Sequence, residues 1–550
     1  MPAIPRSAPC LAAALPLAAL LALGGGLTLS APLSAQSQSD GTANSGMGSD
    51  AVPAPLVPMA EVEQAWERED FTFVRQALAQ LAEQTGTPLA QYRYGRVLLE
   101  GRGGPRDLDG ATLWLEKAVA QDHIQAATLL ARVYLSAPEG ARDGARAAAL
   151  LTGSAARGDA EAQYYLALLV SAGDGVPKDE ARAVSWLLAA AEQQHAEAQY
   201  ALARAYARGA GTAEDPAKAR RWLEEAAANN HRDAQFYLAN AYDNGQGVPL
   251  NKTEALRWYL RAAEQGLPLA QRRLGTRYLR GEDVAADAET ALHWLTAAAE
   301  AGDPGAMANL GWGYARGQVL PKDDALAAHW YDRAADTGLG RAQLALGLFY
   351  QTGRGVEVDL AKAVKLYRQA AEQDTPGASA QLASLAISGQ LETLMAPHDM
   401  VPWVAAAARQ QAEENADQEA NEALSWLQSR AGEDIRPAQL ALAQLYLEQG
   451  GDAATAAQLL DRAAQAGDAT AQAALGQLYT TGTGVALDYV QAHKWLNIAA
   501  ASGAAGAADT REVIAQLMTP EQIAEAQSAA RSFFESPPPI PQTAPAESDQ

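Results

Sequence analysis

The sequence has almost no cysteine. Cys10 is the only one in 550 residues. It lies in an N-terminal segment that we expect to be removed, so the mature chain would have no disulfide and no thiol chemistry. Phenylalanine is also scarce, at six residues. An α/β enzyme would carry more Val, Ile and Phe, whereas alanine-rich helices with few large anchors suit stacked helix pairs.

Positive charge is in short supply. The chain holds 42 Lys and Arg against 65 Asp and Glu, which gives a formal net charge of −23. A surface this acidic repels phosphate backbones and anionic lipid headgroups. We therefore expect no nucleic-acid partner and no binding to an anionic membrane surface.

Long apolar runs are absent except at the start of the chain. Arg6 precedes the run Leu11–Leu23, and Leu33-Ser34-Ala35 offers a small-residue cleavage site before Gln36. This layout predicts a signal peptide over residues 1–35 and a periplasmic or secreted protein. An uncleaved anchor is the alternative, but Pro16 and three glycines interrupt a run that is already short for a spanning helix. After cleavage we expect no membrane insertion.

An internal repeat of 36 residues dominates the rest of the chain. Three sets of residues recur at this interval: Trp186, Trp222, Trp258, Trp294 and Trp330; Tyr206, Tyr242, Tyr278, Tyr314 and Tyr350; and the alanines that precede Gln at Ala162, Ala198, Ala234, Ala270 and Ala342. We call the first set, with Trp114, Leu150, Leu366, Trp426, Leu459 and Trp495, the lattice positions. A fixed period of this length predicts a solenoid.

Each repeat is predicted to be a helix pair. In residues 198–233, Ala198, Leu202 and Tyr206 lie on one face of a first helix, which ends at Gly209. Asp215-Pro216 then begins a second helix, with Asp as the N-cap. No such pair could fold alone, so each must bury its apolar stripe against its neighbours. We expect the lattice Trp to be the large buried anchor of each repeat.

The pattern divides the chain into eight segments. These are a signal peptide (1–35), a flexible linker (36–58), an N-terminal helical cap (59–86), repeats (87–389), an irregular repeat or insertion (390–437), further repeats (438–506), a C-terminal helical cap (507–535) and a disordered tail (536–550).

The register breaks once, since Leu366 and Trp426 lie 60 residues apart. The intervening segment contains Pro397 and Pro402, which disfavour a continuous helix. Irregular insertions in repeat arrays usually form a loop on one face, often the binding face. A degenerate repeat that still packs is the alternative. Either would change the superhelical path.

The repeat resembles the Sel1-like, tetratricopeptide-related family. The pattern A-Q-x-x-L-[GA]-x-x-Y, G-x-G-V, A-x-x-W-x-x-x-A-A is well represented by Ala234–Tyr242, Gly245–Val248 and Ala255–Ala263, and similar units cover roughly residues 87–506. The resemblance implies an all-α fold, a right-handed α-solenoid of tandem helix-turn-helix repeats with a concave binding surface. It also implies an adaptor or regulator, as in exported bacterial members, and the family has no shared catalytic residues.

Three features could suggest chemistry. The Gly-x-Gly loops, such as Gly209/Gly211, follow helices instead of strands and are interpreted as turns, not phosphate cradles. His123, His195 and His231 occupy one repeat position, too far apart for a single metal ion, and are interpreted as surface turn residues. Paired carboxylates, as in Glu224-Glu225 and Glu413-Glu414, are typical of solvated helix faces. We therefore predict no catalytic, cofactor-binding or metal-binding residues, and no enzyme.

The sequence favours a periplasmic scaffold or regulator that binds a protein partner. The alternative is an envelope glycan-binding or enzyme-accessory protein. Because the lattice Trp are expected to be used in packing, sugar-stacking aromatics would have to be other residues, such as Trp312 and Trp403.

Overall fold

The structure, a computed structural model, describes residues 56–137, 142–414 and 422–535. The expected signal peptide, the tail and most of the expected linker lie outside these residues. The described residues form helices and turns, without strands. The chain divides into two compact units at Leu274–Gly275, and each is described by itself.

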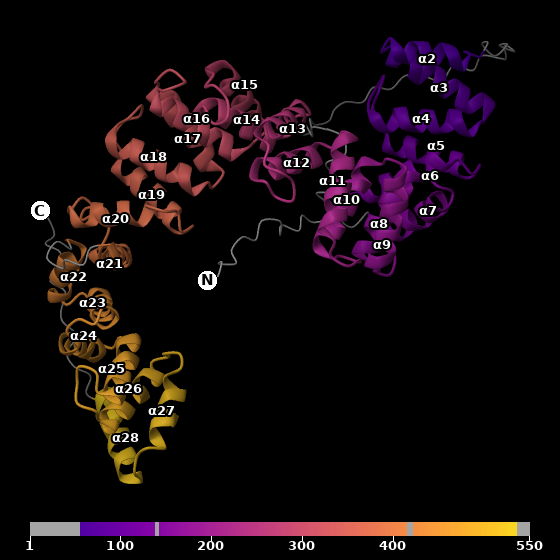
Figure 1. Cartoon of the computed structure of the whole chain (residues 1–550). Coiled ribbons are helices and arrows are strands. Elements are labelled where there is room, and N and C mark those ends of the chain that lie inside the picture. Colours follow the sequence, from indigo (N-terminus) through magenta and orange to yellow (C-terminus); the bar gives the residue numbers. More distant parts are fainter. Residues whose placement is uncertain (1–55, 138–141, 415–421, 536–550) are drawn as a thin grey trace, which may run out of the picture. The chain divides into compact units, whose positions relative to one another are not determined.

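The elements of the two units are labelled in Figure 1. Unit 1 contains α2 (Met59–Glu67), α3 (Phe71–Thr85), α4 (Pro88–Glu100), α5 (Leu108–Val119), α6 (Ile124–Ser136), α7 (Gly144–Ala156), α8 (Ala160–Ala172), α9 (Glu180–Glu192), α10 (Ala196–Arg208), α11 (Pro216–Ala228), α12 (Arg232–Asn244) and α13 (Lys252–Glu264). The division falls within α14 (Pro268–Arg280). Unit 2 contains α15 (Ala288–Glu300), α16 (Pro304–Arg316), α17 (Asp324–Asp336), α18 (Gly340–Thr352), α19 (Leu360–Ala371), α20 (Ala378–Ile387), α21 (Pro397–Glu414), α22 (Glu422–Gly432), α23 (Arg436–Glu448), α24 (Ala453–Gln465), α25 (Ala469–Thr481), α26 (Tyr489–Ala501), α27 (Ala507–Ala515) and α28 (Pro520–Glu535).

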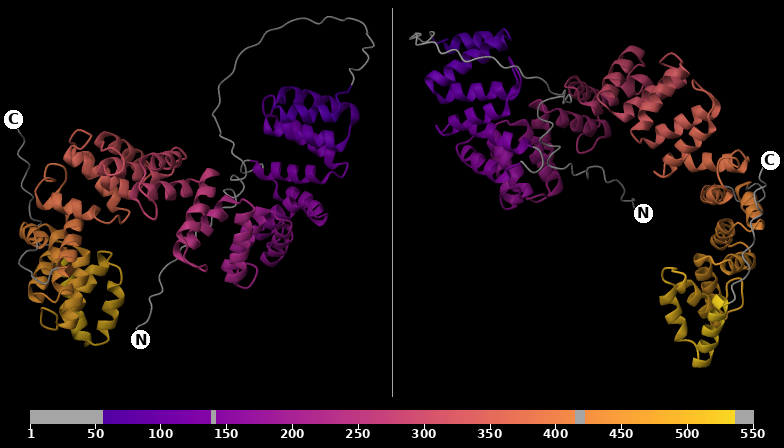
Figure 2. Two further views of the ribbon diagram at one scale, coloured as in Figure 1. Left: turned by 45° about the horizontal axis from the view of Figure 1, so that its top comes forward. Right: turned by 180° about the vertical axis from the view of Figure 1, so that it is seen from behind.

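Consecutive helices pair within each repeat, as the views in Figure 2 show for α16 to α19. The predicted ends of the two helices in residues 198–233 are confirmed. The Asp215 carboxylate accepts a hydrogen bond from the Lys218 N–H, and Gly209 ends α10 in the left-handed conformation. At Gly211, an added Cβ would lie 2.2 Å from the Glu180 carbonyl of the preceding second helix, and its φ of +70° also favours glycine. The Gly-x-Gly loop is therefore a structural turn.

The glutamine of each Ala-Gln pair is buried and joins successive repeats. The Gln199 Nε2 donates to the Ala191 carbonyl at the end of the preceding second helix (3.1 Å), and its Oε1 accepts from Asn229 of the next turn (2.9 Å). Gln235 repeats both bonds, to Ala227 and from Gln265. These carbonyls also accept from the backbone N–H groups of Gln194 and Asn230 in the following turns, at 3.0 and 3.2 Å. The glutamines therefore add a second hydrogen bond at each helix end, and this bond ties one repeat to the next.

Most of the lattice Trp are not the buried anchors that the sequence predicts, although Trp426 and Trp495 are buried. Trp222, Trp258 and Trp294 are only half-buried. In most repeats the residue after the lattice position fills the core, and the completely buried examples are Leu115, Leu151, Tyr259, Leu295, Tyr367, Leu427, Leu460 and Leu496. For the half-buried Trp the prediction was wrong, because the Trp lies one residue, about 100° of helix rotation, away from the centre of the apolar stripe.

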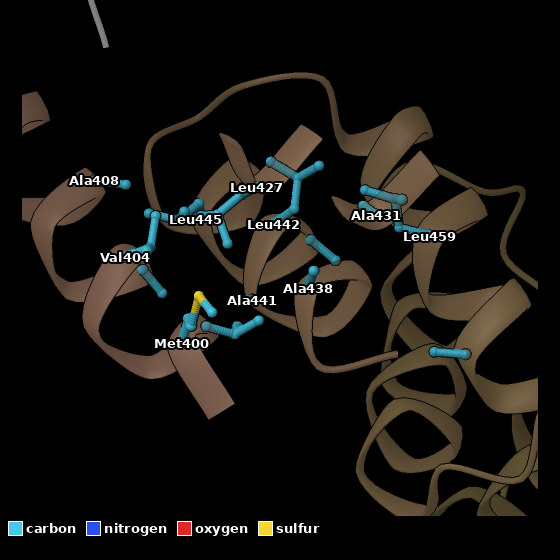
Figure 3. Packing of buried hydrophobic residues seen from close by; sticks show 14 of the residues in the cluster. Met400, Val404, Ala408, Leu427, Ala431, Ala438, Ala441, Leu442, Leu445 and Leu459 are labelled. Carbon is cyan, nitrogen blue, oxygen red and sulfur yellow. The ribbon is translucent and has the colours of Figure 1, made fainter. Parts of the chain in front are cut away.

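The break in register is filled by an additional helix. Residues Pro397–Glu414 form α21, which continues through Pro402, so the interpretation of this insertion as a loop is wrong. Figure 3 shows Met400 and Val404 of α21 directed toward Ala441 and Leu445 of α23, and all four side chains are buried. One hydrophobic cluster runs without interruption from α19 through α21 to α26. The segment is therefore a packed part of the solenoid within unit 2.

None of the helices in the described ranges is both long enough and apolar enough to cross a membrane.

Candidate binding surface

Five aromatic residues on the first helices of neighbouring repeats form a row in unit 1. We call this the aromatic row: Tyr164, Tyr165, Tyr200, Phe236 and Tyr237, from α8, α10 and α12. The rings of Tyr200 and Tyr237 stack with centroids 6.1 Å apart and planes inclined by 20°. Tyr237 is 37% exposed. The row therefore places aromatic side chains at the same position in three successive repeats, and the stacked pair of Tyr200 and Tyr237 joins two of them.

The repeat itself places these side chains. Each follows the buried glutamine of its helix by one or two residues, so it lies next to the inter-repeat contact. A histidine of the following turn packs against the ring. His195 lies 5.1 Å from Tyr164, and His231 lies 4.4 Å from Tyr200, measured between ring centroids.

These histidines lie in the turns between repeats, as the sequence predicts, but they are half-buried and act as helix N-caps. The Nδ1 atoms of His195 and His231 accept hydrogen bonds of 3.2 Å from the N–H groups of Ala198 and Ala234. His123 caps α6 in the same way. Asp159, Asp303 and Asp468 take this role in other repeats. The histidines therefore act as uncharged acceptors, and burial lowers the pKa of His123 and His231.

Arginines and carboxylates border the aromatic row. The Arg132 guanidinium lies 5.5 Å from the Tyr165 ring and pairs with Glu161 at 2.8 Å. Arg204 lies 5.8 Å from the Tyr200 ring. Burial raises the pKa of Tyr164, Tyr165 and Tyr200, so their phenols remain neutral hydrogen-bond groups.

This arrangement suits contact with another protein. Tyr and Arg are the residue types most enriched at binding hot spots, because they supply large contact areas together with a polar end. Sequence reasoning missed the row. It followed the tyrosine series beginning at Tyr206, although the aromatic residues directly after each Ala-Gln pair were a signal for it.

The two aromatics that the glycan-binding alternative would use are both engaged in intramolecular contacts. Trp312 on α16 is half-buried, and the guanidiniums of Arg280 and Arg316 lie 5.3 and 5.4 Å from its ring. Trp403 on α21 packs against the core of unit 2. The structure does not bring them together as a platform for a glycan.

Within the described residues, no group of three or more His, Cys, Asp or Glu could hold a metal ion. Glu224 and Glu225 lie on α11, and the side chains of Glu413 and Glu414 are outside the described residues.

Comparisons with known proteins give a consistent result. The model of the Sel1 repeat family matches nine segments: 88–123, 160–195, 196–231, 232–267, 268–303, 304–339, 340–375, 436–468 and 469–503. A search of curated proteins gives no significant match.

Among solved structures, the chain is similar to a protective antigen of uropathogenic Escherichia coli strains that displays an SLR fold. The identity is 26% and the TM-score 0.51, and the match covers 86% of this chain and 99% of that one. It is also similar to a Sel1 repeat protein from Oxalobacter formigenes, with 31% identity, a TM-score of 0.42, and coverage of 61% of this chain and 95% of that one.

Proposed function

This chain belongs to the Sel1 repeat family, and on that premise we propose that it is a periplasmic protein-binding scaffold or regulator. The family fold is an α-solenoid that typically serves protein interaction. The observation that carries the proposal is the aromatic row, in which three successive repeats place aromatic side chains at the same position, Tyr200 stacks on Tyr237, and Arg132 and Arg204 border the rings. The N-terminal sequence, with its basic residue, apolar run and small-residue site, supports export.

The mechanism would be binding through the first helices of unit 1. A partner segment lying along α8, α10 and α12 would meet one aromatic group per repeat. Since each ring is fixed by a neighbouring histidine or tyrosine, little side-chain entropy is lost when the partner binds.

Photo-crosslinking in the native host tests the proposal. A photoreactive phenylalanine analogue replaces Tyr237, and a matched variant carries it at Phe534, which is 52% exposed on α28. We expect a discrete protein adduct at position 237, recovered from the periplasmic fraction, that is reduced by Tyr200→Ala. If both positions give the same adducts, or neither gives one, the aromatic row is not the binding surface.

A further inference from the structure

A hollow on the surface of unit 2 lies next to the break in register. It has a volume of about 440 Å³ and is formed by one side of α19 together with Leu394 and Met395, which follow α20. Regular repeats have a short turn where this segment lies. The hollow is therefore a product of the irregular repeat.

The connecting segment is held in place. Leu391 is completely buried in the core of unit 2. The Glu392 carboxylate pairs with Arg430 of α22 at 2.7 Å. Between these anchors and α21, Leu394 remains 42% exposed at the hollow. Val364 and Met395 complete an apolar floor.

The rim of the hollow is basic in a chain that is strongly acidic. Helix α19 carries Lys362, Lys365 and Arg368 and has no Asp or Glu between its ends. Lys362 is already paired with Asp359 at 3.3 Å. Lys365 and Arg368 are exposed and form no ion pair with any residue in the described ranges. They are one helical turn apart on the side that lines the hollow.

We propose that this hollow docks an acidic peptide segment of a partner protein, with an apolar side chain on the floor of Val364, Leu394 and Met395 and carboxylates at Lys365 and Arg368. This rests on the proposed scaffold function and identifies the chemistry of a partner. The apolar floor favours such a peptide over a bare polyanion, and the rim keeps two cations, Lys365 and Arg368, against the single carboxylate of Glu372. The charge contrast would also speed association and exclude basic segments.

Fluorescence anisotropy with the full mature chain tests this inference. The probe is a fluorescein-labelled 12-residue peptide of Glu and Leu at helical spacing, and the control peptide has Lys in place of every Glu. The variants are K365E/R368E, which reverses the rim, and L394D, which charges the floor. Arg221→Glu on α11 is the matched control, because Arg221 occupies the repeat position of Lys365 in unit 1 and is also exposed.

We expect the acidic probe to bind, and both hollow variants to bind it about tenfold or more weakly, with R221E unchanged. Circular dichroism checks that the variants remain helical. Equal binding of the Lys peptide, equal weakening by R221E, or unchanged affinity in K365E/R368E would overturn the inference. Crosslinking at position 237 is measured separately. If a partner still crosslinks there but the hollow on α19 does not bind the peptide, the scaffold proposal stands and only this inference is wrong. If no adduct forms at position 237 but the acidic peptide still binds at α19, only the assignment of the aromatic row as a binding surface is wrong.

Discussion

At the scale of residues, adjacent positions in the repeat have different roles. In α15, Leu295 is completely buried, whereas Trp294 is half-buried and packs edge-on against the exposed His293. The Trp identifies the repeat in the sequence, but the Leu fills the core. Stability should therefore depend more on the smaller side chain.

We expect Leu295→Ala to lower the free energy of unfolding by about 2–5 kcal/mol, because it leaves a cavity in a close-packed core. Trp294→Ala should cost less, since much of its ring already contacts water. Urea unfolding followed by circular dichroism measures both. A larger loss for Trp294→Ala would contradict the assignment of the anchor.

The capping histidines add a pH dependence. A protonated His231 Nδ1 cannot accept the hydrogen bond of the Ala234 N–H, and burial lowers the pKa of this histidine in the folded chain. The unfolded chain, with a pKa of about 6.5, then binds more protons as the pH falls. The contribution of the neutral cap is fully present above about pH 6.5 and is lost as the pH falls through the lower pKa of the folded state.

His231→Asn keeps an N-cap acceptor without the titration. We expect the melting temperature of the native chain to fall more between pH 7.5 and pH 5 than that of H231N, as measured by calorimetry. The exposed His293→Asn serves as the control. Parallel curves for the native chain and H231N would show that the cap does not titrate in this range.

At the scale of elements, the local signals for helix ends are strong. Thr519 and Gln522 form a capping box at the start of α28: the Gln522 N–H donates to Thr519 Oγ1 (3.3 Å) and the Thr519 N–H donates to Gln522 Oε1 (2.9 Å). Helix α21 is the exception, because Pro402 suggests an interruption that does not occur. Buried contacts of the residues around it outweigh the missing backbone hydrogen bond.

Helix α21 should therefore be required for the stability of unit 2. We expect Val404→Asp, which places a charge at a completely buried position, to cost about 3 kcal/mol or more. Ala406→Asp on the exposed side of the same helix is the control and should be nearly neutral. Denaturant unfolding measures the free energy of unfolding of both variants. If both lose equally little, α21 is not required for the stability of unit 2.

At the scale of the whole molecule, the chain is a Sel1 repeat α-solenoid whose described residues form two compact units. Its stability is a sum over repeats and their interfaces, so each repeat needs a neighbour. Since residues 36–550 contain no cysteine, no disulfide within them adds to the stability that these interfaces supply.

We predict export with cleavage after Ala35. N-terminal sequencing of the protein from fractionated cells should begin at Gln36, and dithiothreitol should leave the melting temperature of that product unchanged. A full-length cytoplasmic product would contradict the prediction of export. A change in the melting temperature on addition of dithiothreitol would indicate that Cys10 is retained.

The sequence alone determined the repeat, its helix pairs and their caps. A 36-residue period requires the same contacts at every step, and Asp215, Pro216 and Gly209 act through their own backbone neighbours. These are local properties, and local rules predict them.

Only the tertiary structure decided which side chains meet. Periodicity marks Trp294 and Leu295 equally, and the direction of the neighbouring helix determines which one is buried. The stacking of Tyr200 on Tyr237, the packing of α21 and the basic hollow on α19 all depend on contacts between separate helices. Such contacts are set by how the helices pack, and the residues that meet have no fixed separation along the chain by which a single sequence would reveal them.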